Sequence, residues 1–431
     1  MTLDPIVLVV RSTGSGSVEP LPIRANGYRF VDADAVGSED HWDSVILDGR
    51  HGDPDATTTE RACDAARDRG PLLALDAPIS LPASASTDSQ HAGGPIIGDV
   101  LYPPFSPARI GERLDFLRRL YRKHEELAAR QQIIHAGAIS DIRPAMPPAP
   151  APAILIVGLG TRYPVVRNAY PEPATVVGAL STTTARDYLE VQTFDGIVLE
   201  AETPGALSFL TGLRCDARFR NLAVAVLVGN DNSDTIDFFF QAGATEVLGG
   251  RVDPDDLAGR LTGPIRRERQ RRELDAGFAD LKSQAPSDSM TDLYARRLLL
   301  DHLDRLRSEN STEQDLHRAV ALELMNLNDL TDHFGPAAGA HLVRQVGGAI
   351  GTFVRSEDFG IRWNAGRFVI LLAGDGSRAV DHVTGRLRGI VNHTAFATPD
   401  GSTRMPARLA AVPVHDIVPS ASKRVAGFRP R

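Results

Sequence analysis

The sequence predicts an α/β protein of three parts, in which two parallel-sheet units precede a third segment. Short apolar runs alternate with polar, helix-compatible stretches, as in a parallel sheet covered on both faces. This order of runs occurs twice. Five prolines within residues 143–152 separate the two copies and favour an extended spacer.

Composition narrows the class of protein. The chain has 431 residues and a net charge of −8, which argues against a broad nucleic-acid interface. No apolar run reaches the roughly 20 residues of a membrane span, and the first residues lack a signal-peptide pattern, so we expect a cytoplasmic protein without membrane insertion. The two cysteines, Cys63 and Cys215, indicate no disulfide framework or metal site and are expected to be buried.

The first unit is assigned to residues 1–136. Its predicted strands include Ile6–Val10, Ser44–Asp48 and Leu72–Leu75. Ser106 followed by Pro107 predicts the start of a long closing helix, because serine caps helices and proline is favoured at the first helical position. The Pro/Ala-rich linker is placed at 137–152.

The second unit is assigned to residues 153–264, with predicted strands at 154–157, 196–200, 224–228 and 246–248. A helical connector follows at 265–286. Its arginines are expected to form a solvated face, because Leu274, Phe278 and Leu281 recur at helical spacing beneath them. The third segment covers 287–431, and its end from Pro413 shows little periodicity.

The repeated units resemble flavodoxin-like (βα)5 receiver domains of response regulators. In the first copy Asp48 stands at the phosphoacceptor position, but no carboxylate lies between Asp4 and Glu19 to hold Mg²⁺. Asp76 and Pro103 replace the family's hydroxyl residue and lysine. Phosphoryl transfer would lack charge neutralisation, so phosphorylation of Asp48 is the minority hypothesis beside an exposed strand-end carboxylate or a helix N-cap.

The second copy departs further from the receiver pattern. Gly158 and Leu159 fill the positions of the acidic pair, Glu200 replaces the acceptor and Gly250 replaces the lysine. A dinucleotide-binding loop is disfavoured because Gly158-Leu-Gly160 lacks a third glycine, and a tight turn explains it better. Both copies are therefore predicted to be interaction or dimerisation platforms, and a homodimer is expected.

The third segment resembles GGDEF domains, the ferredoxin-like catalytic modules of diguanylate cyclases. Residues 288–297 resemble the D-x-L-T-G-L-x-N-R-R opening, and residues 331–340 resemble N-D-x-x-G-H-x-x-G-D. Residues 362–368 align without a gap with R-Y-G-G-D-E-F. The resemblance covers about 287–412.

The family's catalytic residues are mostly absent. Gly366 and Arg367 replace the two signature carboxylates, while Thr331 and Ala340 replace the guanine-binding Asn and Asp. Glu323 is the sole surviving metal-ligand position, and one carboxylate cannot support a two-metal reaction. The resemblance therefore implies a protein that is not an enzyme and binds no metal.

The family's inhibitory site is retained. Arg355-Ser-Glu-Asp358 matches its RxxD motif, and Arg386 matches the second arginine on the following helix. An arginine fork can donate two hydrogen bonds to guanine O6 and N7, and a carboxylate can accept from the opposite edge. Cyclic di-GMP is therefore the expected ligand of Arg355, Asp358 and Arg386. A surface Arg-Asp ion pair is the alternative.

Two degenerate receivers followed by an inactive GGDEF domain also resemble cell-cycle effectors of two-component signalling that work as proteolytic adaptors. That resemblance implies the partners RcdA, CtrA and the ClpXP protease, and localisation at a cell pole. The rival hypotheses are a diguanylate cyclase with residual activity and a structural scaffold without ligand.

Overall fold

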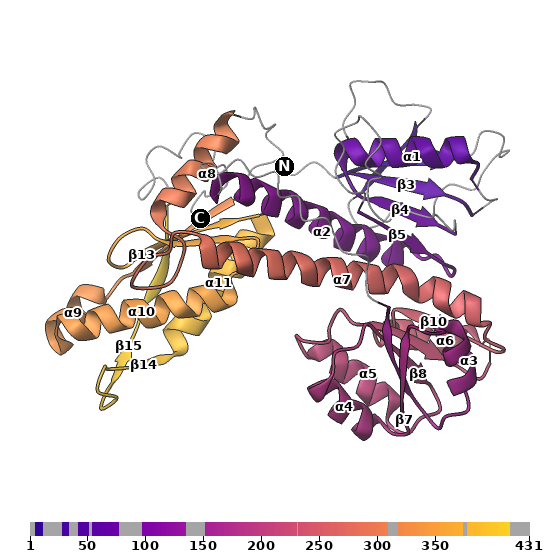
Figure 1. Ribbon diagram of the computed structural model, residues 1–431. Helices are drawn as coiled ribbons and strands as arrows, with labels where there is room; N and C mark the ends of the chain where they lie inside the picture. The colour runs from indigo at the N-terminus through magenta and orange to yellow at the C-terminus, as the bar shows by residue number, and fades with distance from the viewer. Residues whose placement is uncertain are drawn as a thin grey trace. The chain divides into compact units, whose positions relative to one another are not determined.

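A computed structural model shows the architecture (Figure 1). It describes residues 5–11, 28–33, 42–50, 54–76, 97–134, 151–230, 232–308, 318–373 and 377–413. The chain divides into two compact units. One combines residues 3–121 with 143–272, and the other combines residues 1–2, 122–142 and 273–431. Most of the predicted linker, at 137–150, and the C-terminal stretch from 414 lie outside the described residues.

The first sheet is fully parallel and has the strand order β2-β1-β3-β4-β5. Figure 1 labels β3, β4 and β5 of this sheet. Its strands are β1 (Ile6–Arg11), β2 (Arg29–Asp32), β3 (Ser44–Asp48), β4 (Leu72–Leu75) and β5 (Gly98–Leu101). The helices that accompany them are α1 (Ala56–Arg69) and α2 (Pro107–Ile134). This 2-1-3-4-5 order is that of flavodoxin-like folds. The predicted start of α2 is confirmed, since the Ser106 hydroxyl accepts from the Arg109 amide.

The second sheet repeats the same topology, with the order β10-β9-β8-β6-β7. Its strands are β6 (Ala153–Val157), β7 (Thr175–Ala179), β8 (Gly196–Glu200), β9 (Ala223–Leu227) and β10 (Glu246–Leu248). Its helices are α3 (Tyr163–Ala169), α4 (Thr182–Val191), α5 (Ala206–Cys215), α6 (Ser233–Gln241) and α7 (Pro254–Gln284). The predicted repeat of one α/β unit is therefore confirmed.

The residues predicted to form a solvated connector belong to helix α7, which is continuous from 254 to 284 and includes Pro264. The expectation that its arginines form a solvated face is wrong. Arg267 is buried and pairs with Asp99 at 2.8 Å, and Arg269 pairs with Asp195 at 2.6 Å. Carboxylates on neighbouring elements draw these guanidinium groups inward, and sequence periodicity does not reveal those partners.

The third segment forms an antiparallel sheet of order β12-β13-β11-β16 beside a small hairpin of β14 (Ala395–Ala397) and β15 (Arg404–Pro406). The sheet strands are β11 (Arg318–Leu324), β12 (Phe359–Arg362), β13 (Arg367–Leu372) and β16 (Leu409–Val412). The helices are α8 (Arg296–Ser308), α9 (Leu327–Phe334), α10 (Pro336–Phe353) and α11 (Ser377–His393). The βαββαβ order is ferredoxin-like, as predicted.

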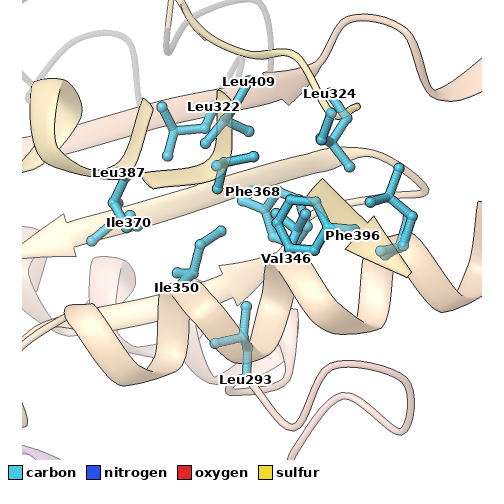
Figure 2. Packing of buried hydrophobic residues seen from close by; sticks show 14 of the residues in the cluster. Leu293, Leu322, Leu324, Val346, Ile350, Phe368, Ile370, Leu387, Phe396 and Leu409 are labelled. Carbon is cyan, nitrogen blue, oxygen red and sulfur yellow. The ribbon is translucent and has the colours of Figure 1, made fainter. Parts of the chain in front are cut away.

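One core holds this domain together. Phe368 and Ile370 of the sheet pack with Val346 and Ile350 of α10, and Leu387 of α11 joins them (Figure 2). All five side chains are buried, and each contributes roughly 1.5–3 kcal/mol of hydrophobic stabilisation. This core fixes the hairpin β12-β13 and the end of α10, the elements that carry the candidate site.

The expectation that both cysteines are buried is wrong for one of them. Cys63 is buried inside α1, as predicted, but Cys215 is exposed because it is the last residue of α5.

Candidate functional site

Asp48 ends strand β3 and is enclosed by arginines. Its carboxylate accepts from Arg50 Nε at 2.8 Å and from Arg11 Nε at 3.2 Å, and its side chain is 1% exposed. Burial alone would raise the pKa of Asp48, but the hydrogen bonds and charge of Arg50, joined by Arg11, hold it below the usual value. The hypotheses that Asp48 is an exposed strand-end carboxylate or a helix N-cap are both wrong, because two guanidinium groups neutralise this buried acid.

Glu200 occupies the corresponding position in the second sheet and fastens a loop. Its carboxylate accepts from the backbone amides of Leu159 and Arg162, both at 2.9 Å. A Cβ at Gly158 would lie 2.5 Å from the Glu200 side chain, so any larger residue there would displace this carboxylate from the loop. The interpretation of the Gly158–Gly160 segment as a tight strand-to-helix turn fits this geometry, since β6 ends at Val157 and α3 begins at Tyr163.

The degenerate signature turn lies between β12 and β13. Glu323 on β11 is directly opposite Arg367 in the antiparallel register, and Arg367 Nε lies 3.0 Å from Glu323 Oε1. The one surviving carboxylate of the cyclase pattern therefore has a cation of the chain itself as its partner. Arg367 takes the place next to Glu323 where the family has an acidic residue.

The positions of the guanine-binding residues offer little polarity. Thr331 donates its hydroxyl to the Leu327 carbonyl at 2.8 Å, within its own helix α9. Ala340 on α10 is half-buried and carries only a methyl group. Gly366 lies in the turn itself, and its carbonyl accepts from the Leu324 amide at 2.9 Å. These side chains do not reproduce an Asn and Asp pair that selects guanine.

The RxxD motif forms a tight turn between α10 and β12. The Asp358 amide donates to the Arg355 carbonyl at 3.1 Å, and the Asp358 carboxylate accepts from the Ala373 amide at 2.9 Å. Arg355 has 64% of its side chain exposed, whereas Asp358 is only 5% exposed. Burial raises the pKa of Asp358 to about 6, against the lowering effect of the Ala373 hydrogen bond. The turn thus combines an exposed guanidinium, which lies 3.9 Å from Glu357 Oε1, with a carboxyl whose charge is poorly solvated.

Arg386 is exposed on α11, and its guanidinium lies 5.1 Å from the centre of the Phe353 ring. Phe353 is the last residue of α10 and precedes Arg355 by two positions. The predicted trio is therefore gathered around the C-terminal end of α10. Its role in ligand binding stays a prediction.

Two polar contacts around this domain escaped sequence reasoning. Asp288 of the opening motif accepts a fork of hydrogen bonds from Arg362, at 2.9 and 2.7 Å, and thereby ties the first motif to the signature hairpin. Burial would raise the pKa of Asp288, but the Arg362 and Thr291 hydrogen bonds lower it to about 2. The second contact joins Arg130 of α2 to the RxxD turn. Both motifs had been recognised, but only the fold shows which side chains meet.

Within the described parts of the chain, no three His, Cys, Asp or Glu side chains gather as a group that could hold a metal ion. In the same residues, no helix combines the length and apolar character needed to span a bilayer.

Part of the chain matches a known protein family. Residues 285–407 match the family described as "Diguanylate cyclase, GGDEF domain". The two sheets of order 2-1-3-4-5 that precede this region are receiver-like. The chain thus has two receiver-type sheets followed by a C-terminal GGDEF domain.

Among curated proteins, the chain is similar to the response regulator PleD of Caulobacter vibrioides, with 24% identity over 195 residues. The match covers 45% of this chain and 43% of PleD, which is less than half of either protein. The relationship to PleD is therefore distant.

Solved structures overlap with single parts of the chain. The GGDEF domain of DgcB from Caulobacter crescentus, in complex with c-di-GMP, is 17% identical and has a TM-score of 0.29; the match covers 32% of this chain and 86% of that one. The receiver domain of the Francisella response regulator 1452 is 18% identical and has a TM-score of 0.25, covering 27% of this chain and 98% of that one.

Proposed function

We propose that this protein is a catalytically inactive cyclic di-GMP effector that binds the dinucleotide at Arg355, Asp358 and Arg386. The observation that carries the proposal is the contrast between two sites of one domain. In the signature turn, Arg367 neutralises Glu323 at 3.0 Å. In the RxxD turn, Arg355 is exposed and Arg386 lies over the helix end that leads to it.

The RxxD turn suits a guanine base. The Arg355 guanidinium can donate two parallel hydrogen bonds to O6 and N7, and the second oxygen of Asp358 can accept from N1 and N2. Arg386 would contact the other base or a phosphate. The same ligand chemistry is named for one relative, the GGDEF domain of DgcB, whose structure holds c-di-GMP.

Calorimetric titration of the full chain with cyclic di-GMP tests this site. Because each good bidentate contact is worth about 1–3 kcal/mol, Arg355→Ala and Arg386→Ala should each raise Kd by roughly 5- to 150-fold. Arg388→Ala is the matched control, since Arg388 is exposed on the same helix two residues further on. A flat titration of the wild-type protein would support the ligand-free scaffold instead.

The proposed lack of cyclase activity is tested in a separate assay. The purified chain incubated with GTP and Mg²⁺ should form no cyclic di-GMP, because one neutralised carboxylate cannot hold two metal ions. Turnover that is lost in Glu323→Ala would contradict the proposal and establish a residual cyclase.

The architecture supports a finer proposal. Two degenerate receivers and an inactive GGDEF domain resemble PopA, a PleD paralogue, and on that resemblance we assign the chain a role as a polar, proteolytic adaptor. It would deliver CtrA, together with RcdA, to ClpXP when cyclic di-GMP is bound. Reconstituted degradation of CtrA should then accelerate with cyclic di-GMP and lose this response in Arg355→Ala. Equal degradation rates with and without the nucleotide would remove the adaptor role but leave the binding site intact.

A further inference from the structure

The middle of the RxxD turn is held from outside the GGDEF domain. Arg130, near the C-terminal end of α2, donates from Nη1 to the Ser356 carbonyl at 3.0 Å, and its Nη2 donates to the Glu357 carbonyl. Ser356 and Glu357 are the two residues between Arg355 and Asp358. One guanidinium therefore fixes two consecutive peptide groups of the candidate ligand turn.

The burial of Arg130 shows how tightly this contact is built. Its side chain is 0% exposed, and its Nε donates to Glu126 Oε1 at 2.8 Å. The guanidinium carbon lies 3.8 Å from the centre of the Phe359 ring and 5.0 Å from that of Phe278. A buried cation is tolerated only when it is paired and its donors are satisfied. Arginine is required here because the planar fork can reach both carbonyls while its faces stack on aromatic rings.

A second contact braces the same turn. Lys123, two helical turns before Arg130, lies 3.1 Å from the Glu357 carboxylate, and Asp275 of α7 accepts from the Ser356 hydroxyl at 2.9 Å. Helices α2 and α7 thus both contact the interior of the turn, while Arg355 remains on its outer side with 64% of its side chain exposed.

We propose that Arg130 is a positioning residue, through which the packing of α2 sets the geometry of Arg355 and Asp358. This inference rests on the proposed function for its ligand. Because coupling between two sites is reciprocal, nucleotide bound to the turn also stabilises the packing of α2. Helix α2 starts at Pro107, directly after the first sheet, so ligand binding and the helix that closes the first receiver-type domain become linked.

The first test needs no ligand. In Arg130→Lys the charge remains but the fork is lost, so backbone amides of residues 355–359 should exchange hydrogen for deuterium about tenfold faster than in the wild type. Arg119→Lys is the matched control, because Arg119 is exposed on the same helix. Unchanged exchange at 355–359 in Arg130→Lys would overturn the inference.

The second test uses cyclic di-GMP. Arg130→Lys should weaken binding about tenfold, within the usual range of couplings between contacting residues, and Arg119→Lys should not. In the wild type the nucleotide should slow amide exchange in residues 126–134, and this protection should vanish in Arg130→Lys. A residue that only stabilises the fold would not transmit that protection. Nucleotide binding that leaves residues 126–134 unprotected in the wild type therefore overturns the linkage.

The outcomes separate the two proposals. If the wild-type chain binds no nucleotide, the proposed function fails, while the exchange of residues 355–359 still decides whether Arg130 holds the turn. If binding is normal in Arg130→Lys, the inference fails and the ligand site stands. Should Arg130→Lys not fold, Lys123→Met removes the neighbouring brace and should shift exchange and affinity in the same direction by about threefold. No shift there refutes the brace.

Discussion

At Asp358, the stability of the fold favours the protonated carboxyl, whereas binding of the proposed ligand requires the ionised form. Its carboxyl is 5% exposed, and burial raises its pKa to about 6. An ionised Asp358 is therefore unfavourable in the folded chain, although a guanine base needs the ionised form as its acceptor. Asp358→Asn removes the charge and keeps a side-chain oxygen that can accept from the Ala373 amide. We expect this variant to be more stable than the wild type at neutral pH.

The magnitude follows from the two pKa values. The ordinary pKa of an aspartate is 3.8 and the pKa of Asp358 in the folded chain is about 6. The penalty for ionising Asp358 at pH above 6 is therefore about 3 kcal/mol, at about 1.4 kcal/mol per pKa unit. Between these values the folded state binds more protons than the unfolded state, and the stability of the wild type falls as pH rises from 3.8 to about 6. The variant lacks this slope. Since its neutral amide accepts a weaker hydrogen bond, the net gain should be about 1–3 kcal/mol at pH 7.5.

Urea unfolding of the full chain measures this gain. The chain has two tryptophans, and Trp363 lies next to the signature turn of the GGDEF domain, so a Trp42→Phe background reports on this domain alone. Asp381→Asn is the control, because Asp381 is exposed on α11. A variant Asp358→Asn that is less stable than the wild type at pH 7.5, or that keeps the pH slope between 4 and 6, would refute the reasoning.

Three further results are expected. Asp288→Asn should destabilise the GGDEF domain by about 1–3 kcal/mol in the same urea assay, because it breaks the charged fork of hydrogen bonds from Arg362. In the wild type this stabilisation is lost as the pH falls below 4 towards about 2. Acid unfolding that is unchanged in the variant would contradict this expectation. Asp48 should remain unmodified in mass spectra after incubation with acetyl phosphate and Mg²⁺, whereas an added phosphoryl group on Asp48 would show that the arginines do not block it. Cyclic di-GMP should bind about tenfold more weakly at pH 5 than at pH 7.5, because Asp358 must lose its proton to accept from guanine; an affinity independent of pH would exclude that role.

The apolar runs were enough to predict most of the architecture. Strands β1, β3 and β4 are almost wholly buried, so each stands out as an uninterrupted apolar run. Strands β2 and β7 lie at sheet edges and have exposed or half-buried residues, so they give no such signal. The repeat was predicted from the order of the apolar runs, whereas the ferredoxin-like third domain was predicted from its resemblance to the GGDEF motifs.

The candidate site was predicted less completely, for a physical reason. Motif alignment names the residue at a position, as it did for Arg355 and Arg367, but it does not name the partner of that residue. The arginines of α7 were expected in solvent, and Asp99 and Asp195 instead hold two of them inside the fold. Arg130 lies on a helix that was predicted correctly, yet its contact spans 226 residues of sequence, which no local pattern reports.

Two of the degenerate positions, Asp48 and Glu323, share one electrostatic feature. Where the receiver pattern places carboxylates and Mg²⁺ beside the acceptor, Arg11 and Arg50 bind Asp48. Where the cyclase pattern places metal ligands, Arg367 binds Glu323. A carboxylate stripped of its metal would be costly to keep inside a fold, and a guanidinium of the chain itself supplies the missing positive charge. Such a pair cannot exchange its cation for a metal without leaving the arginine unpaired. Ligand recognition then depends on cations that stay exposed. Arg355, which lies 3.9 Å from Glu357 but has 64% of its side chain exposed, and Arg386 meet that condition better than the signature turn does.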